Sequence, residues 1–289
     1  MRVTVRVPAT SANLGPGFDC FGLALDLCNE VTVDTEAEPG VTWEGEGADE
    51  LPTDGSDMVS RAMREAAREH GSPLPPLALH GTNAIPFERG LGSSAAAAIA
   101  GAALARAILG APRLNEPYAT FQVASRLEGH PDNAAAAAYG GVVLVVEDVV
   151  RPLEPHPDLR PVLLVPDDLR LATDDARRVL PDPVPRHDAV WGIAHGAALV
   201  VGLTRDPRLL SLAMVDRLHE EQRLALMPEA RAVRDHVRSL GPAVCVSGSG
   251  PSLLAFEDDE SVVPDDVRPG WRVLRLRVRT TGVEFSVED

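Results

Sequence analysis

Hydrophobic and polar residues alternate near both ends of the chain, as in strands that bury one face. Val3, Val5 and Val7 alternate with polar residues, and a similar run begins at Trp271. Other alternating or continuous apolar runs, bounded by turn residues, predict further strands. The predicted strands cover residues 3–7, 29–36, 40–46, 77–82, 140–148, 162–166, both ends of 243–256, 271–278 and 283–288.

Between these strands, the spacing of apolar residues predicts helices. An alanine-rich helix is expected to follow the segment ERGLGSS and to run to about Leu109, and the run AAAAAY at 134–139 also favours helix. The remaining predicted helices cover residues 58–69, 116–127, 174–180, 188–204, 208–225 and 228–239. Strands and helices mix without regular βαβ alternation, so the predicted fold class is α+β. Four prolines within residues 150–161 indicate a crossover between two halves.

Composition narrows the class of protein. The chain has 289 residues, with 45% hydrophobic and 24% charged residues, which is typical of a globular protein. The formal net charge is −16, which argues against a nucleic-acid partner. No lysine is present, so arginine carries all the fixed positive charge, and biased codon usage accounts for this. The opening reads as a strand, not a signal peptide, and the apolar runs are short, so we expect a cytoplasmic protein without a membrane partner. Cys20, Cys28 and Cys245 lack the spacing of a disulfide framework or zinc site.

The segment PFERGLGSSAA, residues 86–96, is a candidate anion site. Glycines at the mouth of a helix let backbone N–H groups approach a phosphate, and the helix dipole favours the negative charge. Ser93 and Ser94 add hydroxyls that suit phosphate oxygens or Mg²⁺. The alternative is an ordinary helix start with serine as the N-cap. The segment is neither the lysine-containing phosphate loop nor the dinucleotide fingerprint.

Two other segments, 7–25 and 246–256, are also rich in glycine and serine. The three segments, in this order and spacing, resemble the GHMP kinase superfamily, whose nucleotide signature PxxxGLGSSAA matches residues 86–96. Within it, PATSANLGPGFDCFGLAL and EGHPDNAAAAAYGG are most similar to homoserine kinases. The resemblance implies two domains with a nucleotide cleft between them. The N-terminal domain, 1–152, would bind nucleotide and be ribosomal-protein-S5-domain-2-like, and the C-terminal domain, 153–289, would be ferredoxin-like.

The resemblance also implies ATP and Mg²⁺ as cofactors, L-homoserine as the hydroxyl substrate in threonine biosynthesis, and a homodimer. Ser94 and Glu128 would hold Mg²⁺, although Glu128 read alone is a solvated carboxylate at a helix end. The residues expected to cradle ATP are Pro86, Phe87, Glu88, Arg89, Gly90, Leu91, Gly92, Ser93, Ser94, Ala95 and Ala96.

Homoserine carries a carboxylate, which favours arginine, and an ammonium group, which favours carboxylate or amide oxygens. The family's TxxAR segment matches TDDARRVLP, and DRLHEEQR supplies a second arginine. The implied substrate-binding residues are Asn13, Asp19, His130, Asp132, Asn133, Thr173, Arg177 and Arg223. Read alone, the arginines are surface charges, His130 shapes a turn, and Asn13 caps one.

Asp132 is the candidate general base, with substrate binding or the orientation of Asn133 as its alternative roles. Asp57 stands where relatives often carry an asparagine associated with adenine; it can accept a hydrogen bond but, when ionised, cannot donate one. Two other functions stay open. One is a GHMP kinase for mevalonate or a sugar, and the other is a non-catalytic nucleotide-binding regulator of the same fold.

Overall fold

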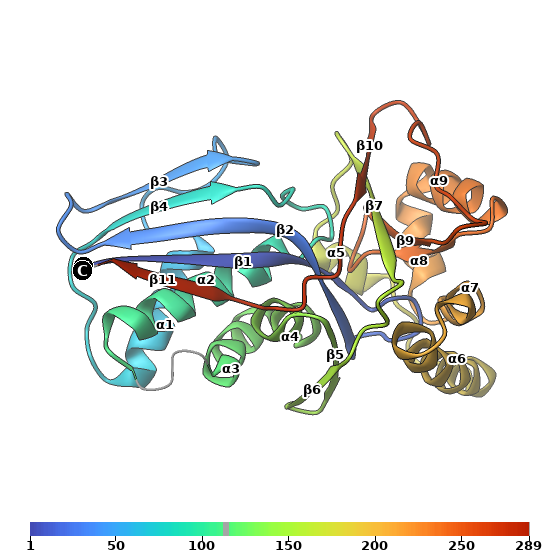
Figure 1. The fold of residues 1–289 in the computed structure, drawn as a ribbon, viewed down its shortest axis with the longest axis horizontal. Helices are drawn as coiled ribbons and strands as arrows, with labels where there is room; N and C mark the ends of the chain where they lie inside the picture. The colour runs from blue at the N-terminus through green and yellow to red at the C-terminus, as the bar shows by residue number, and fades with distance from the viewer. Residues whose placement is uncertain (112–115, 289) are drawn as a thin grey trace.

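Two β-sheets form the frame of the molecule (Figure 1). The computed structural model describes residues 1–111 and 116–288. The larger sheet has the strand order β11-β1-β2-β4-β3, with β5 paired to β2 and β6 paired to β5. Among the strand pairs within residues 1–111 and 116–288, only β3–β4 is parallel. These strands are β1 (Arg2–Ala12), β2 (Phe21–Asp34), β3 (Gly40–Gly45), β4 (Ala78–Asn83), β5 (Val142–Val146), β6 (Val149–Leu153) and β11 (Glu284–Glu288).

The alternation near the N-terminus does mark a strand with one buried face. Val3 pairs with Val33 and Val5 with Val31 across the β1–β2 ladder, and all four side chains are buried. Both strands are longer than predicted, because the Gly- and Ser-rich segment 7–25 is mostly strand. Only residues 13–20 leave the sheet, and this loop reaches the site described below.

Four helices lie on one face of the larger sheet (Figure 1). Helices α2 and α4 contact its strands, and α1 and α3 pack against these helices. They are α1 (Met58–His70), α2 (Ser93–Ile108), α3 (Pro117–Glu128) and α4 (Asp132–Tyr139). Helix α2 is buried on most sides, which explains its run of small residues. At Gly101, an added Cβ would lie 2.2 Å from the Val59 carbonyl oxygen, so α1 and α2 approach too closely for a larger side chain.

The smaller sheet has the order β10-β7-β9-β8. Its strands are β7 (Arg160–Pro166), β8 (Ala243–Val246), β9 (Leu253–Glu257) and β10 (Trp271–Arg275). Helices α8 (Glu220–Leu226) and α9 (Pro228–Ser239) bury Leu224, Val233 and Val237 against it. The other helices of this half are α5 (Thr173–Arg178), α6 (Arg186–Thr204), the 3-10 turn η1 (Pro207–Leu209) and α7 (Leu210–Ala213). The predicted α+β class is confirmed.

The single helix predicted over 208–225 is wrong. The chain forms η1 and α7, leaves helical geometry after Ala213, and starts α8 at Glu220. The cause is the Asp216 carboxylate, whose Oδ2 accepts the backbone N–H groups of Leu218, His219 and Glu220 at 3.0, 2.7 and 2.8 Å. An acidic side chain that satisfies free N–H groups favours a new helix start.

The C-terminal strand lies in the larger sheet. Strand β11 runs antiparallel to β1, with Arg2 opposite Glu288 and Arg6 opposite Glu284. The N-terminal sheet therefore takes an edge strand from the far end of the chain. A division at residues 152 and 153 stays a prediction. Among residues 1–111 and 116–288, every helix is too short or too polar to cross a bilayer.

Candidate active site

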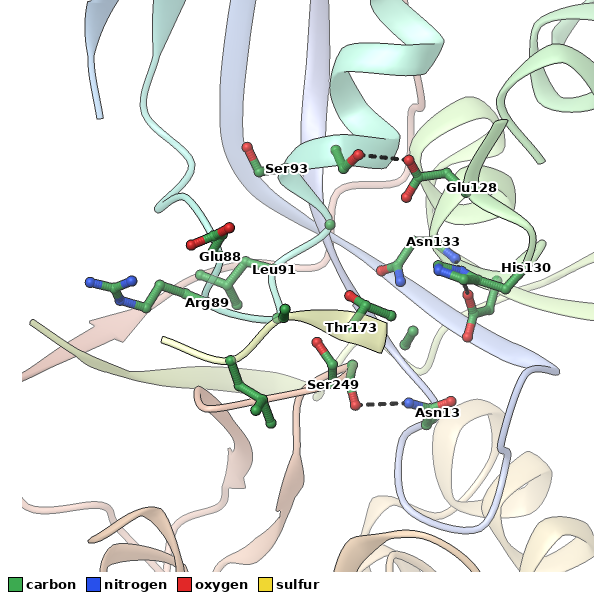
Figure 2. A pocket seen from close by; sticks show the side chains of 18 of the residues that line it. Asn13, Glu88, Arg89, Leu91, Ser93, Glu128, His130, Asn133, Thr173 and Ser249 are labelled. Atoms are coloured by element: carbon green, nitrogen blue, oxygen red, sulfur yellow. Dashed lines mark hydrogen bonds and ion pairs between the residues drawn. The ribbon is translucent and has the colours of Figure 1, made fainter. Parts of the chain in front are cut away.

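A cavity of about 270 Å³ lies where the two halves meet (Figure 2). Its walls come from the β1–β2 loop, the segment between β4 and α2, the start of α4, the start of α5, α8, and the β8–β9 loop. Of the predicted site residues, Ala95 and Ala96 alone do not line it; they are buried within α2. Residues from all three glycine- and serine-rich segments thus share one cavity.

The start of α2 is open to a ligand. Gly92 is the N-cap residue, with φ of 68°, and no side chain caps the helix. The alternative of a serine N-cap is therefore not what the structure shows. Uncapped N–H groups and the helix dipole at a cavity wall are features of an anion-binding site.

Two glycines permit the loop's close contacts. At Gly92, an added Cβ would lie 1.9 Å from Thr10 Oγ1, and at Gly90 it would lie 2.3 Å from the Ser247 carbonyl oxygen. Both glycines have positive φ. Ser247 also donates its hydroxyl to the Gly90 carbonyl at 2.8 Å. The loop is therefore held between β1 and the β8–β9 turn.

Ser94 and Glu128 meet at the edge of the cavity, where Ser94 Oγ donates to Glu128 Oε1 at 2.6 Å (Figure 2). Glu128 is the last residue of α3. Burial raises the pKa of Glu128, and the hydrogen bond from Ser94 opposes that shift. The described residues contain no group of three or more His, Cys, Asp or Glu that could hold a metal. Any cation at this pair would need further oxygen ligands from a nucleotide or water.

The segment from His130 to Asn133 forms a chain of hydrogen bonds. His130 Nδ1 lies 3.2 Å from Asp132 Oδ1, and the same oxygen accepts the Asn133 backbone N–H at 2.7 Å. Asn133 Oδ1 accepts the Thr10 hydroxyl at 2.7 Å. Burial lowers the pKa of His130, but the hydrogen bond to Asp132 and its charge outweigh burial and raise it. This chain fixes Asp132 at the start of α4, facing the cavity.

Two arginines converge on the other side of the cavity, beside the Phe18 ring. The guanidinium carbons of Arg177 and Arg223 lie 5.5 and 5.2 Å from the ring centroid. Arg177 binds both carboxylate oxygens of Asp19, at 3.0 and 2.6 Å. Its charge is therefore already paired.

Arg223 differs, because within the described chain it makes no ion pair. Its side chain is 2% exposed, and Nη1 donates to the Gly248 carbonyl at 2.8 Å and contacts His219 Nδ1 at 3.2 Å. Burial lowers the pKa of Arg223 to about 10, and the charge of Arg177 adds to the effect. At neutral pH the group is still a cation, so the cavity presents a buried positive charge that lacks an anion.

Asn13 organises the β1–β2 loop. Its Nδ2 donates to the Gly248 carbonyl at 2.9 Å, and its Oδ1 accepts the Asp19 N–H at 3.1 Å. Both Asn13 and Asp19 have positive φ, at 70° and 56°. The turn-capping alternative for Asn13 is thus present in the structure, alongside a place on the cavity wall. Thr173, the first residue of α5, faces the same cavity (Figure 2).

Arg89 anchors the loop to the protein through backbone oxygens. Its guanidinium donates to the Pro166 carbonyl at 2.9 Å, to the Phe87 carbonyl at 3.1 Å, and to the Asp167 carbonyl. Glu88 lies 3.8 Å from Arg170 in a long ion pair. The nucleotide contacts predicted for these two side chains stay predictions.

Several residues of the site escaped the sequence analysis. Thr10 and Ser247 support the loop, Gly248 accepts from both Asn13 and Arg223, and Ser249 lines the cavity. The glycine spacing of the segment 246–256 drew attention to it, but no role followed from the spacing alone.

A second, smaller cavity of about 80 Å³ adjoins the first and shares Phe87, Ser93 and Ser94 with it. Trp43 and Met58 contribute apolar surface, and Asp57 supplies a carboxylate. Asp57 caps α1, because its Oδ1 accepts the Ser60 N–H at 2.9 Å. Its Oδ2 is buried and has no hydrogen-bond partner among the described residues. A flat apolar group that carries an N–H donor would contact the apolar walls of this cavity and donate a hydrogen bond to Asp57 Oδ2.

Known proteins resemble this chain in sequence and in fold. Residues 57–141 match the family model described as the GHMP kinases N terminal domain. The homoserine kinase of Cutibacterium acnes is 46% identical, over 98% of this chain and 98% of its own length. That of Clavibacter michiganensis subsp. michiganensis is 40% identical, over 100% and 95%.

A crystal structure of homoserine kinase from Cytophaga hutchinsonii superposes with a TM-score of 0.87 at 27% identity, covering 99% of this chain and 97% of that chain. The fold and the sequence therefore give the same assignment across nearly the whole length. This chain belongs to the homoserine kinases of the GHMP kinase superfamily.

Proposed function

We propose that this chain transfers the γ-phosphoryl group of ATP to the side-chain hydroxyl of L-homoserine, forming O-phospho-L-homoserine and ADP in threonine biosynthesis. The observation that supports this proposal most strongly is that one cavity holds both parts of the site. It joins an uncapped helix start and the Ser94–Glu128 pair to a buried arginine that lacks an anion. Such a cavity suits a polyphosphate and a small carboxylate side by side.

The loop from Pro86 to Ala96 supports nucleotide binding. The N–H groups at the start of α2 face the phosphates, while Gly90 and Gly92 permit close approach. Ser94 and Glu128 offer two oxygen ligands to Mg²⁺, which suits a cation that keeps phosphate and water ligands. When bound, Mg²⁺ supplies charge neutralisation at the transferring phosphoryl group.

The opposite side of the cavity supports the amino-acid substrate. Arg223 pairs with the homoserine carboxylate, Arg177 and Thr173 line the same region, and Asp19 and Asn13 receive the ammonium group. Asp132 accepts the hydroxyl proton as the oxygen attacks the γ-phosphorus and the bond to the β–γ bridging oxygen breaks. His130 orients Asp132 through the 3.2 Å contact. The alternative for Asp132 is substrate binding without proton transfer.

The test is steady-state ADP release with MgATP and L-homoserine, run beside L-serine, L-threonine and mevalonate. Release with homoserine alone supports both the reaction and the carboxylate site. Release only with mevalonate would replace the substrate assignment while keeping the nucleotide site. No release with any alcohol would favour a non-catalytic nucleotide-binding regulator.

We further propose a cytoplasmic homodimer. Helix α6 supports this assembly, because Val190 and Ile193 on it are 59% and 75% exposed. On a chain of net charge −16, an uncharged apolar stripe is where two copies can meet without repulsion. Light scattering of the native protein and of Ile193→Arg tests the assembly; a monomer in both samples would overturn it.

A further inference from the structure

We propose that His219 is a positioning residue for Arg223: its neutral imidazole, protonated at Nε2, holds the guanidinium toward the cavity. The inference rests on the proposed function, in which Arg223 binds the homoserine carboxylate. His219 precedes α8 and is fully buried, and it does not line the cavity. It therefore acts through Arg223 and not on the substrate.

The two partners of His219 determine its tautomer. Nε2 lies 2.8 Å from the Gly15 carbonyl oxygen, which can only accept, so Nε2 must carry the proton. Nδ1 lies 3.2 Å from Arg223 Nη1, which can only donate, so Nδ1 must present its lone pair. One neutral form of the ring satisfies both contacts.

The charges around the ring agree with a neutral imidazole. Asp216 Oδ2 lies 3.7 Å from Nε2, beyond hydrogen-bond distance, and is occupied by three backbone N–H groups. Burial lowers the pKa of His219; the Asp216 charge opposes this, and the Arg223 charge reinforces it. A second proton, on Nδ1, would point at the guanidinium and break the contact.

Arg223 depends on this contact for its orientation. Its Nη1 has two acceptors, His219 Nδ1 and the Gly248 carbonyl, and its Nε is buried without a partner. The Phe18 ring packs beside both groups, 5.1 Å from the His219 ring. Without His219, the Gly248 carbonyl would be the one hydrogen-bond acceptor left among the described residues to orient this long, flexible side chain.

His219 also connects two distant parts of the chain. The Gly15 carbonyl belongs to the β1–β2 loop, which carries Asn13 and Asp19. At Gly15, an added Cβ would lie 3.0 Å from the Met214 backbone, so this loop and the segment before α8 are already in close contact. The ring therefore aligns Arg223 with the loop that lines the other side of the substrate region.

A pair of isosteric substitutions separates the two contacts. In His219→Gln, the amide nitrogen can take the place of Nε2 and donate to Gly15, but no atom faces Arg223. In His219→Asn, the amide oxygen can take the place of Nδ1 and accept from Arg223, while the Gly15 contact is lost. His236→Gln, at an exposed position on α9, is the matched control.

We expect His219→Gln to raise the KM for homoserine about tenfold or more, since hydrogen bonds to charged groups are worth this much. The KM for ATP and kcat should stay within about threefold, because only substrate binding is weakened. His219→Asn should restore most of the homoserine affinity, and His236→Gln should change nothing. In an Arg223→Gln background, His219→Gln should have no further effect on the homoserine KM.

Binding of homoserine measured by calorimetry supplies a readout independent of turnover. A folded His219→Gln protein with wild-type homoserine affinity would overturn the positioning role. So would equal losses in His219→Gln and His219→Asn, which indicate a general packing effect. Failure of the proposed function is recognised separately, because the wild-type protein would then neither bind nor phosphorylate homoserine.

Discussion

Ser94 Oγ lies 2.6 Å from Glu128 Oε1, so the first turn of α2 and the last residue of α3 are joined at the cavity edge. Both residues line the cavity proposed to bind the nucleotide. In Glu128→Gln, a neutral amide replaces the carboxylate that we propose as a Mg²⁺ ligand. We expect kcat/KM to fall about 100-fold or more, because charge neutralisation by a metal is worth several kcal/mol.

The same substitution should raise the Mg²⁺ concentration needed for half-maximal activity, which a titration at fixed ATP measures. Burial raises the pKa of Glu128, so protonation removes this ligand as the pH falls through the raised value. The Mg²⁺ requirement of the wild-type protein should therefore increase on the acid side. A Glu128→Gln enzyme with the wild-type Mg²⁺ dependence would exclude a role in metal binding.

Gly92→Ala should abolish ATP binding or unfold the loop, because the added Cβ would lie 1.9 Å from Thr10 Oγ1. Gly71→Ala is the matched control: its φ is also positive, at 77°, but nothing lies within 4 Å of the added Cβ. Both variants carry the backbone strain, of about 1 kcal/mol, and only Gly92→Ala carries the clash. Nucleotide binding by calorimetry and the melting temperature should be measured for both; equal behaviour would rule out the clash.

Asp57 should favour adenine over bases that lack an amino donor at the same position. Its Oδ2 is buried without a partner in the small apolar cavity, and a carboxylate there can only accept. We expect ATP to be used at least about tenfold better than inosine triphosphate, which presents an oxygen instead of the amine. In Asp57→Asn this preference should shrink, while α1 keeps its cap because asparagine caps equally well. An unchanged ratio of kcat/KM values would show that Asp57 does not contact the base.

Glu220 should make stability fall as the pH rises from about 4.5 to 7. Burial raises the pKa of this carboxyl to about 7, and the charges of Arg234 and Arg238 only partly offset the shift. The folded protein then holds a proton that the unfolded chain has released, so ionisation costs the folded state up to about 3 kcal/mol. Relative to Glu220→Gln, the wild-type protein should lose unfolding free energy over this range. Denaturant titrations of both proteins at pH 5 and pH 8 measure the free energy of unfolding. The same change between the two pH values in both proteins would contradict the shifted pKa.

Local sequence patterns predicted much of the fold. The valine alternation at 3–7 marks a strand, the alanine run marks a buried helix, and the helix predicted over 58–69 matches α1 (Met58–His70) to within one residue. The break before α8 was missed, because it depends on one carboxylate, Asp216, whose bonds to backbone N–H groups compete with helix continuation.

For the candidate site, too, local features were predictable from the sequence and contacts between distant segments were not. The local glycine and serine pattern indicated the loop at 86–94, and the resemblance to the GHMP kinases implied the other predicted residues that line the cavity. Their roles in binding and catalysis stay predictions. Contacts between distant segments could not be predicted. His219 meets Gly15 across 204 positions, and Arg223 forms no ion pair with any described residue because of what surrounds it in three dimensions.

The pairing of β11 with β1 determines when the larger sheet can be completed during synthesis. The edge of β1 finds its partner only when residues 284–288 have left the ribosome, although β1 is made long before them. Contacts of such long sequence separation form late and slow folding. Until these residues are available, an unpaired edge rich in valine is open to other chains. Completion of the larger sheet thus waits for residues 284–288, and a product truncated before residue 284 would carry that exposed edge permanently.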